Sequence, residues 1–66
     1  MNILLNGEKT AIESDTTVSG IIAKYSLKEE TTVAEVNGII IKREDFKATK
    51  LKDADRVELV RFVGGG

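Results

Sequence analysis

Short apolar runs separated by Asn-Gly dipeptides shape the pattern of hydrophobic and polar positions along this chain of 66 residues. The first run, Asn2 to Leu5, is followed by Asn6-Gly7 and by a second run from Lys9 to Glu13. Asn-Gly between two such runs favours the type I′ turn of a β-hairpin. Because side chains alternate between the two faces of a strand, Ile3 and Ile12 are expected in the core.

The spacing changes after Thr17. From there apolar residues recur at i, i+3, i+4 and i+7, the stripe of an amphipathic helix: Val18, Ile21, Ile22 and Tyr25. Thr16 or Thr17 is the expected N-cap, since its hydroxyl can accept a hydrogen bond from a free N–H of the first turn. The stripe is expected to pack against one face of a sheet.

The alternation of strands returns in the second half of the chain. Thr31 to Val36, Asn37-Gly38 and Ile39 to Lys42 repeat the run–turn–run pattern and predict a second hairpin. A last strand is predicted from Arg56 to about Phe62. Alternation assigns its side chains to two faces, Val57 and Leu59 on one, and Glu58, Val60 and Phe62 on the other.

A polar segment, Arg43 to Lys50, connects the second hairpin to Leu51, and Phe46 is the residue expected to anchor it to the core. The predicted order is therefore ββαββ, a connector and β. Runs of strands with a single helix are typical of α+β folds. We expect one mixed sheet covered by one helix, a domain at residues 1–63 and a flexible C-terminal tail at residues 64–66.

Composition removes most enzyme chemistry. The chain has no Cys and no His, so it lacks a thiolate nucleophile, a disulfide, a Zn–S site and an imidazole base. At this length folding buries only about 60% of the surface that the unfolded chain exposes, which leaves little room for a deep pocket. We expect a protein that is not an enzyme and that binds no metal or cofactor of its own.

The charges are balanced and interspersed, with ten Lys and Arg against eleven Asp and Glu. Such a distribution gives no positive field to hold a nucleic-acid backbone. The longest apolar runs, Ile3-Leu4-Leu5 and Ile39-Ile40-Ile41, are far below the roughly 20 residues of a membrane span, and no signal peptide pattern is present. The sequence predicts a cytoplasmic protein that binds neither nucleic acid nor membrane.

Half of the six glycines are the last three residues, Gly64, Gly65 and Gly66. Such an end is often a frayed terminus or an expression remnant. Alternatively, the α-carboxylate of Gly66 is the reactive group, presented on a thread without side chains. Residues 63–66, fully extended at about 3.3–3.6 Å per residue, would reach about 13–14 Å into a partner's active site. A carboxylate is a poor electrophile, so that partner would have to activate it.

Five motifs in order span the chain: Met1-x-Ile3-x-x-Asn6-Gly7, Thr17-Val18-x-x-Ile21-Ile22, Val33-Ala34-x-Val36-Asn37-Gly38 before Arg43, Leu51-x-Asp53-x-Asp55, and Val57 to Gly66. Together they resemble the β-grasp, ubiquitin-like fold and, within it, the ThiS family of sulfur carriers. Lys42 stands where relatives often have Pro, and Ala54 where they often have Gly. If the turn at Ala54 needs a positive φ, its Cβ costs roughly 1–2 kcal/mol.

The resemblance implies a sulfur carrier of thiamin biosynthesis. An E1-like adenylyltransferase (ThiF-like) would use ATP and Mg²⁺ to adenylate the carboxylate of Gly66. Sulfur drawn from cysteine by a desulfurase, or from another donor, would replace AMP and give a thiocarboxylate. Thiazole synthase (ThiG-like) would then take this sulfur into the thiazole ring.

A partner-binding surface is expected on the sheet face that the helix leaves uncovered. Its expected residues are Val60, Phe62 and Val63, with some of Ile39, Ile41 or Leu4 beside them. Arg61 and Arg56 are expected to pair with acidic partner residues, although solvated charges on a strand are at least as common. Isolated exposed apolar residues are normal on protein surfaces, so this surface is a hypothesis.

Three other functions stay open. The small subunit of molybdopterin synthase shares the fold and the Gly-Gly end but gives its sulfur to a pterin precursor. A ubiquitin-like modifier would be joined to lysines through Gly66. A β-grasp binding module would use no C-terminal chemistry.

Overall fold

The computed structural model describes residues 1–63, and the predicted tail, residues 64–66, lies outside them. The secondary-structure elements are β1 (Asn2–Leu5), β2 (Glu8–Ala11), α1 (Val18–Lys24), the 3₁₀ turn η1 (Glu29–Thr31), β3 (Thr32–Val36), β4 (Ile39–Ile41), the 3₁₀ turn η2 (Arg43–Asp45) and β5 (Arg56–Arg61). The predicted order of strands and helix is confirmed. The domain boundary at residue 63 stays a prediction.

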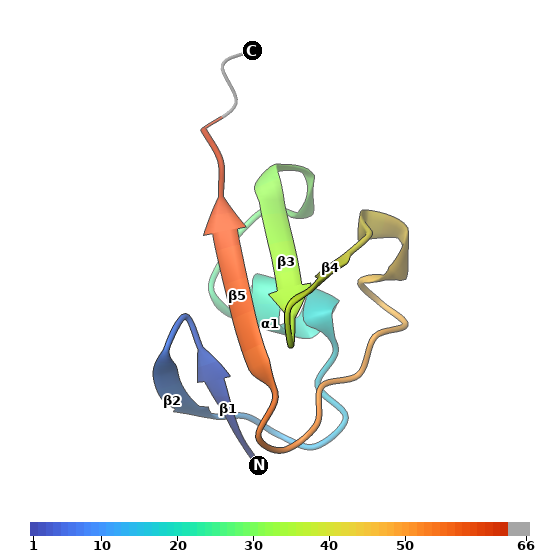
Figure 1. The fold of residues 1–66 in the computed structure, drawn as a ribbon. Helices are drawn as coiled ribbons and strands as arrows, with labels where there is room; N and C mark the ends of the chain where they lie inside the picture. The colour runs from blue at the N-terminus through green and yellow to red at the C-terminus, as the bar shows by residue number, and fades with distance from the viewer. Residues whose placement is uncertain (64–66) are drawn as a thin grey trace.

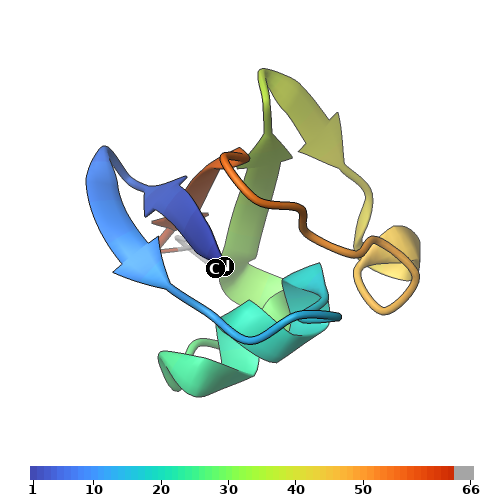
Figure 2. The ribbon, with the colours of Figure 1, turned by 90° about the horizontal axis from the view of Figure 1, so that it is seen from below.

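The strands form one sheet in the order β2-β1-β5-β3-β4 (Figure 1). The pairs β1–β2, β3–β4 and β3–β5 are antiparallel, whereas β1 and β5 are parallel, so the sheet is mixed as predicted. The last strand therefore lies in the middle, between the two hairpins. Helix α1 covers one face of the sheet, as the view from below shows (Figure 2), which confirms the α+β class.

Both hairpin turns have the backbone that Asn-Gly predicts. Asn6 and Gly7 have φ values of 50° and 81°, and Asn37 and Gly38 have values of 52° and 84°. Positive φ at both central residues defines the type I′ turn, whose twist matches that of the flanking strands. The two predicted hairpins are confirmed.

The two turn asparagines also attach the hairpins to β5. The side-chain Oδ1 of Asn6 accepts a hydrogen bond from the N–H of Leu59 at 2.9 Å, and its Nδ2 donates to the carbonyl of Leu59 at 3.3 Å. The Oδ1 of Asn37 accepts from the N–H of Arg56 at 2.9 Å, and its Nδ2 donates to the buried carboxylate of Asp55, also at 2.9 Å. Each asparagine therefore sets a turn and couples a hairpin to the central strand.

The core lies between the helix and the sheet and consists of ten buried apolar residues: Ile3, Ile12, Val18, Ile21, Ile22, Ala34, Phe46, Leu51, Val57 and Leu59. Phe46 is 2% exposed, so its predicted anchoring role is confirmed. Thr17 is the N-cap, with its hydroxyl accepting a hydrogen bond from the N–H of Gly20 at 3.0 Å. The prediction for Tyr25 was wrong, because the helix ends at Lys24 and Tyr25 is a C-cap residue with 44% of its surface exposed.

The turn before β5 contains a strained alanine. Ala54 has a φ of 72°, a region in which a Cβ costs roughly 1–2 kcal/mol. Ala54→Gly removes this strain but adds backbone entropy to the unfolded chain, worth roughly 0.5–1 kcal/mol. We expect a net gain of about 1 kcal/mol in the free energy of unfolding, measured by urea denaturation. Ala48→Gly, in a turn with negative φ, should instead lose stability, and a destabilised Ala54→Gly variant would contradict this account.

Candidate functional site

The central strand leads the chain out of the core toward the predicted reactive end. Val57 is fully buried and Leu59 is 8% exposed, whereas Phe62 is 47% and Val63 is 90% exposed. Figure 1 shows that β5 ends at the opposite end of the sheet from the N-terminus. The predicted sulfur-carrying residue Gly66, with Gly64 and Gly65, lies outside the described residues, so its role stays a prediction.

A hydrogen bond fixes the point at which the chain leaves the sheet. The N–H of Phe62 donates to the carbonyl of Thr31 at 3.0 Å, one residue beyond the last β3–β5 pair, Thr32 and Arg61. Val63 is the next residue. The hydrogen bond at Phe62 therefore holds the chain in the direction of β5 where it leaves the sheet. We call Phe62 and Val63 the root of the tail.

The sheet face away from the helix carries exposed apolar side chains. Their positions follow from the register, in which Val60 lies opposite Val33, Leu4 beside Arg56, and Ile40 opposite Glu35. We call this set the open-face patch: Leu4, Val33, Ile40 and Val60, with exposed fractions of 41%, 38%, 65% and 55%. Phe62 follows Val60 in the alternation, at the end of the strand.

The structure changes the expected composition of this surface. Of the three residues offered beside Val60 and Phe62, Leu4 lies on the uncovered face, whereas Ile41 pairs with the buried Ala34 and packs partly against the core. Ile39 shares the side of Ile41 by alternation, although 66% of its surface is exposed at the sheet edge. Ile40 and Val33 lie on the uncovered face instead. The signal for Ile40 was present in the sequence, because the two-residue turn fixes Ile39 opposite Val36 and therefore puts Ile40 on the other face.

Charged groups divide between the two sides of β5. Glu58 and Glu35 lie directly opposite one another on the open face, and Arg56 lines the same shallow hollow. Arg61 lies on the other side of the strand, where it lines a groove with Tyr25 and Leu27. The structure therefore does not bring Arg61 together with Val60, and a partner that contacts both must reach around the strand.

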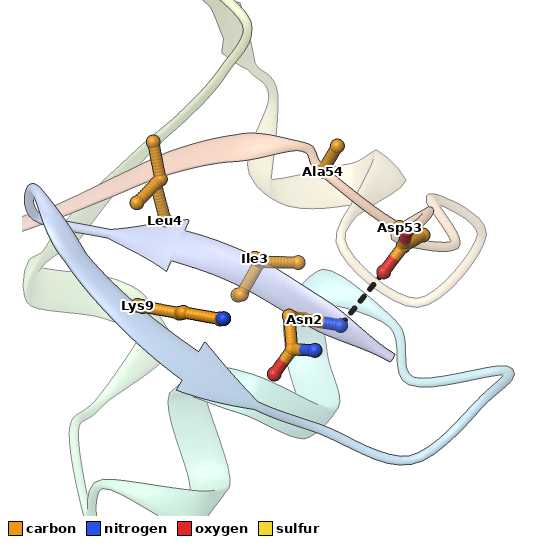
Figure 3. A pocket seen from close by; sticks show the side chains of 6 residues that line it. All are labelled: Asn2, Ile3, Leu4, Lys9, Asp53 and Ala54. Carbon is orange, nitrogen blue, oxygen red and sulfur yellow. Dashed lines mark hydrogen bonds between the residues drawn. The ribbon is translucent and has the colours of Figure 1, made fainter.

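A hollow of about 360 Å³ opens at the other end of the sheet, away from the root of the tail, between β1, β2 and the turn before β5 (Figure 3). Its lining residues are Asn2, Ile3, Leu4, Lys9, Asp53 and Ala54. The carboxylate of Asp53 accepts a hydrogen bond from the main-chain N–H of Asn2 at 2.8 Å, which ties the start of β1 to this turn. This contact supports the entry into β5.

Among residues 1–63 there is no group of three or more His, Cys, Asp or Glu side chains that could hold a metal ion. Within the same range no helix is long and apolar enough to cross a membrane.

Comparison with known proteins gives consistent matches over nearly the whole chain. The model of the ThiS family matches residues 3–66. The sulfur carrier protein ThiS of Bacillus subtilis is 38% identical over 63 residues, which cover 94% of this chain and 96% of that protein. A thiazole synthase of Magnetococcus marinus is 35% identical over 66 residues, and the chain spans only 20% of its length.

Comparison of the fold with solved structures indicates the same family. The crystal structure of the thiamine biosynthesis protein ThiS from Geobacter metallireducens superposes with a TM-score of 0.81 at 35% identity, over 100% of both chains. The match confirms the predicted β-grasp fold, and the relatives favour the thiamin pathway over the pterin alternative. The chain belongs to the ThiS family, the sulfur carrier proteins of thiamin biosynthesis.

Proposed function

We propose that this chain carries sulfur as a thiocarboxylate at the C-terminal carboxylate of Gly66 and delivers it to a thiazole synthase. The observation that supports this most is the family match, which extends through residue 66. The course of β5 is compatible with it, because the strand brings the chain to the surface at Val63. Thiazole synthases of Magnetococcus marinus and Paramagnetospirillum magneticum each contain a segment similar to the whole chain, which supports the choice of partner.

The proposed loading takes place in two steps on partner enzymes. In an E1-like adenylyltransferase, a carboxylate oxygen of Gly66 attacks the α-phosphorus of ATP, whose phosphates are held by Mg²⁺, and pyrophosphate leaves. A desulfurase takes sulfur from cysteine as an enzyme persulfide, and a thiol such as excess cysteine reduces this persulfide to release HS⁻ and is itself oxidised to a disulfide. The HS⁻ then attacks the acyl carbon. The new C–S bond forms as the C–O bond to AMP breaks, and loss of the proton leaves the thiocarboxylate.

The chain itself contributes geometry to these steps. It has no Cys or His to take part as a nucleophile or base near neutral pH. Glycines without Cβ can pass through a narrow channel and adopt φ values that other residues resist. The hydrogen bond between Phe62 and Thr31 gives the tail a fixed starting point. In this proposal the protein is a substrate of its partners and is not itself an enzyme.

Loading is tested by incubating the protein with ATP, Mg²⁺, an E1-like adenylyltransferase, a cysteine desulfurase and cysteine, and by weighing the intact chain. The proposal predicts a mass gain equal to the exchange of one oxygen for one sulfur. Higher-mass conjugates through lysine would instead indicate a modifier. An unchanged mass with an adenylyltransferase that loads the Bacillus subtilis relative would overturn the carrier function.

We further propose that thiazole synthase binds the open-face patch. Val60 lies on the central strand opposite Val33, so Val60→Lys places a charge in the apolar contact and should weaken the affinity at least tenfold, the effect of a modest hot spot. Ile39→Lys is the matched control, because Ile39 is equally apolar and exposed but lies on the other side of its strand. Calorimetry with purified thiazole synthase measures both. Equal affinities of the two variants would contradict this binding surface.

A further inference from the structure

The two sides of β5 are paired unequally near its end. The N–H of Phe62 points toward β3 and donates to Thr31, whereas the N–H and carbonyl of Leu59 point toward β1 and bind the side chain of Asn6. Main-chain groups of successive strand residues point to alternate sides. Arg61 therefore presents its main-chain N–H and carbonyl to the side of β1.

Strand β1 is too short to reach these groups. Its pairing with β5 ends at Leu5 and Val57, and the amide of Asn6 extends the contact only to Leu59 before the chain turns into β2. Among residues 1–63, no hydrogen bond to the main chain of Arg61 is formed from this side. The last part of the central strand thus has an open edge, the kind of edge to which an extended segment of another protein can add.

A groove lies beside this edge. It has a volume of about 320 Å³, and its lining residues are Leu5, Asn6, Glu8, Thr10, Tyr25, Leu27, Leu59 and Arg61. The apolar members come from β1, β5 and the segment after α1, and Tyr25 lies there as the exposed C-cap of the helix. In strand addition, main-chain hydrogen bonds supply affinity and such pockets accept alternate side chains of the added strand.

We propose that thiazole synthase adds an extended segment to the open edge of β5 at Arg61 and places an apolar side chain of that segment in the adjoining groove. The inference rests on the proposed function, since it concerns the enzyme that receives the sulfur. Thiazole synthase is chosen as the occupant because the edge is continuous with the root of the tail, which that enzyme must hold in an extended form. A strand added at Arg61 aligns the tail along β5 before it enters the active site.

The test removes a single donor without changing any side chain. A chemically synthesised chain in which an ester replaces the amide whose N–H belongs to Arg61 loses that donor, while the β3–β5 hydrogen bonds stay in place. Because one hydrogen bond is at stake, we expect the affinity for thiazole synthase to fall about three- to tenfold. Tyr25→Ser, which shortens an exposed wall of the groove, should cause a loss of similar size.

The matched control is the same ester at Lys9, whose N–H points outward from the edge strand β2 because its pair with Leu4 is the first beyond the hydrogen-bonded pair at the turn. It should bind like the native chain. An Arg61 ester that binds as well as the Lys9 ester would overturn the inference, and so would native protein that forms dimers through this edge in sedimentation. Sulfur loading of the same proteins distinguishes a failure of this inference from a failure of the proposed carrier function. If only strand addition is wrong, the native chain still acquires sulfur normally.

Discussion

Deletion of Gly66 is expected to abolish sulfur loading while the fold stays intact. The deletion withdraws the terminal carboxylate by about 3.5 Å, and addition of one residue after Gly66 converts the reacting group into an amide. Because displacement of a reacting atom by about 1 Å can cost a factor of about 100, both variants should load at under about 1% of the native rate. Intact mass after incubation with the complete loading system measures this.

The control for both tail variants is their stability. Residues 64–66 follow the last described strand, so the free energy of unfolding should change by no more than about 0.5 kcal/mol. Loss of loading with native stability separates chemistry from folding. A chain extended beyond Gly66 that still acquires sulfur would contradict the assignment of the reactive carboxylate.

Phe46→Ala is expected to remove a large part of the free energy of unfolding. Phe46 is 2% exposed and lies in the connection between β4 and β5, where its carbonyl also accepts a hydrogen bond from the N–H of Ser19 at 3.1 Å. Truncating a buried Phe costs about 3–5 kcal/mol. A chain of this size has a total stability of only about 3–10 kcal/mol. Circular dichroism during urea and thermal unfolding should show a large loss of stability at 25 °C.

Lys47→Ala, at the exposed neighbouring position, is the matched control and should change the free energy of unfolding by no more than about 0.5 kcal/mol. A Phe46→Ala variant within 1 kcal/mol of the native protein, a loss well below the roughly 3 kcal/mol expected, would show that the connector is not anchored by this residue. Any loss of sulfur loading in Phe46→Ala reports unfolding. The tail variants are therefore the sharper test of function.

Elements set by local sequence were predictable. Asn-Gly determined both hairpin turns because few residue pairs adopt positive φ at two successive positions. The spacing of Val18, Ile21 and Ile22 located the buried face of the helix. The prediction that Tyr25 belongs to the buried face of the helix failed because periodicity alone does not show where a helix ends.

Contacts between distant segments left no local signal. The amide of Asn6 binds the main chain of a residue 53 positions away, and only the folded sheet shows that this amide completes the pairing of the short β1. The same shortness leaves the edge at Arg61 open. The sequence pattern therefore indicates that Asn6 lies in a turn, but not that it holds the hairpin against the central strand.

Part of the candidate surface was predictable. Alternation along the last strand placed Val60 on the uncovered face, where 55% of its surface is exposed. The role of Gly66, to which the glycine run points, stays a prediction. The register of β4 corrected Ile41 and added Ile40. The place of Arg61 could be found only from the structure. It lies on the opposite side of β5 from Val60 and lines a groove that only the folded chain forms.

The position of the carried sulfur tests the central claim most directly. Cysteine labelled with a heavy sulfur isotope is used in the loading reaction, and the intact protein is then fragmented in a mass spectrometer. The account predicts labelled sulfur only in C-terminal fragments that contain Gly66, in place of one carboxylate oxygen. Label in fragments that lack Gly66, or label retained by a chain extended beyond Gly66, would contradict it.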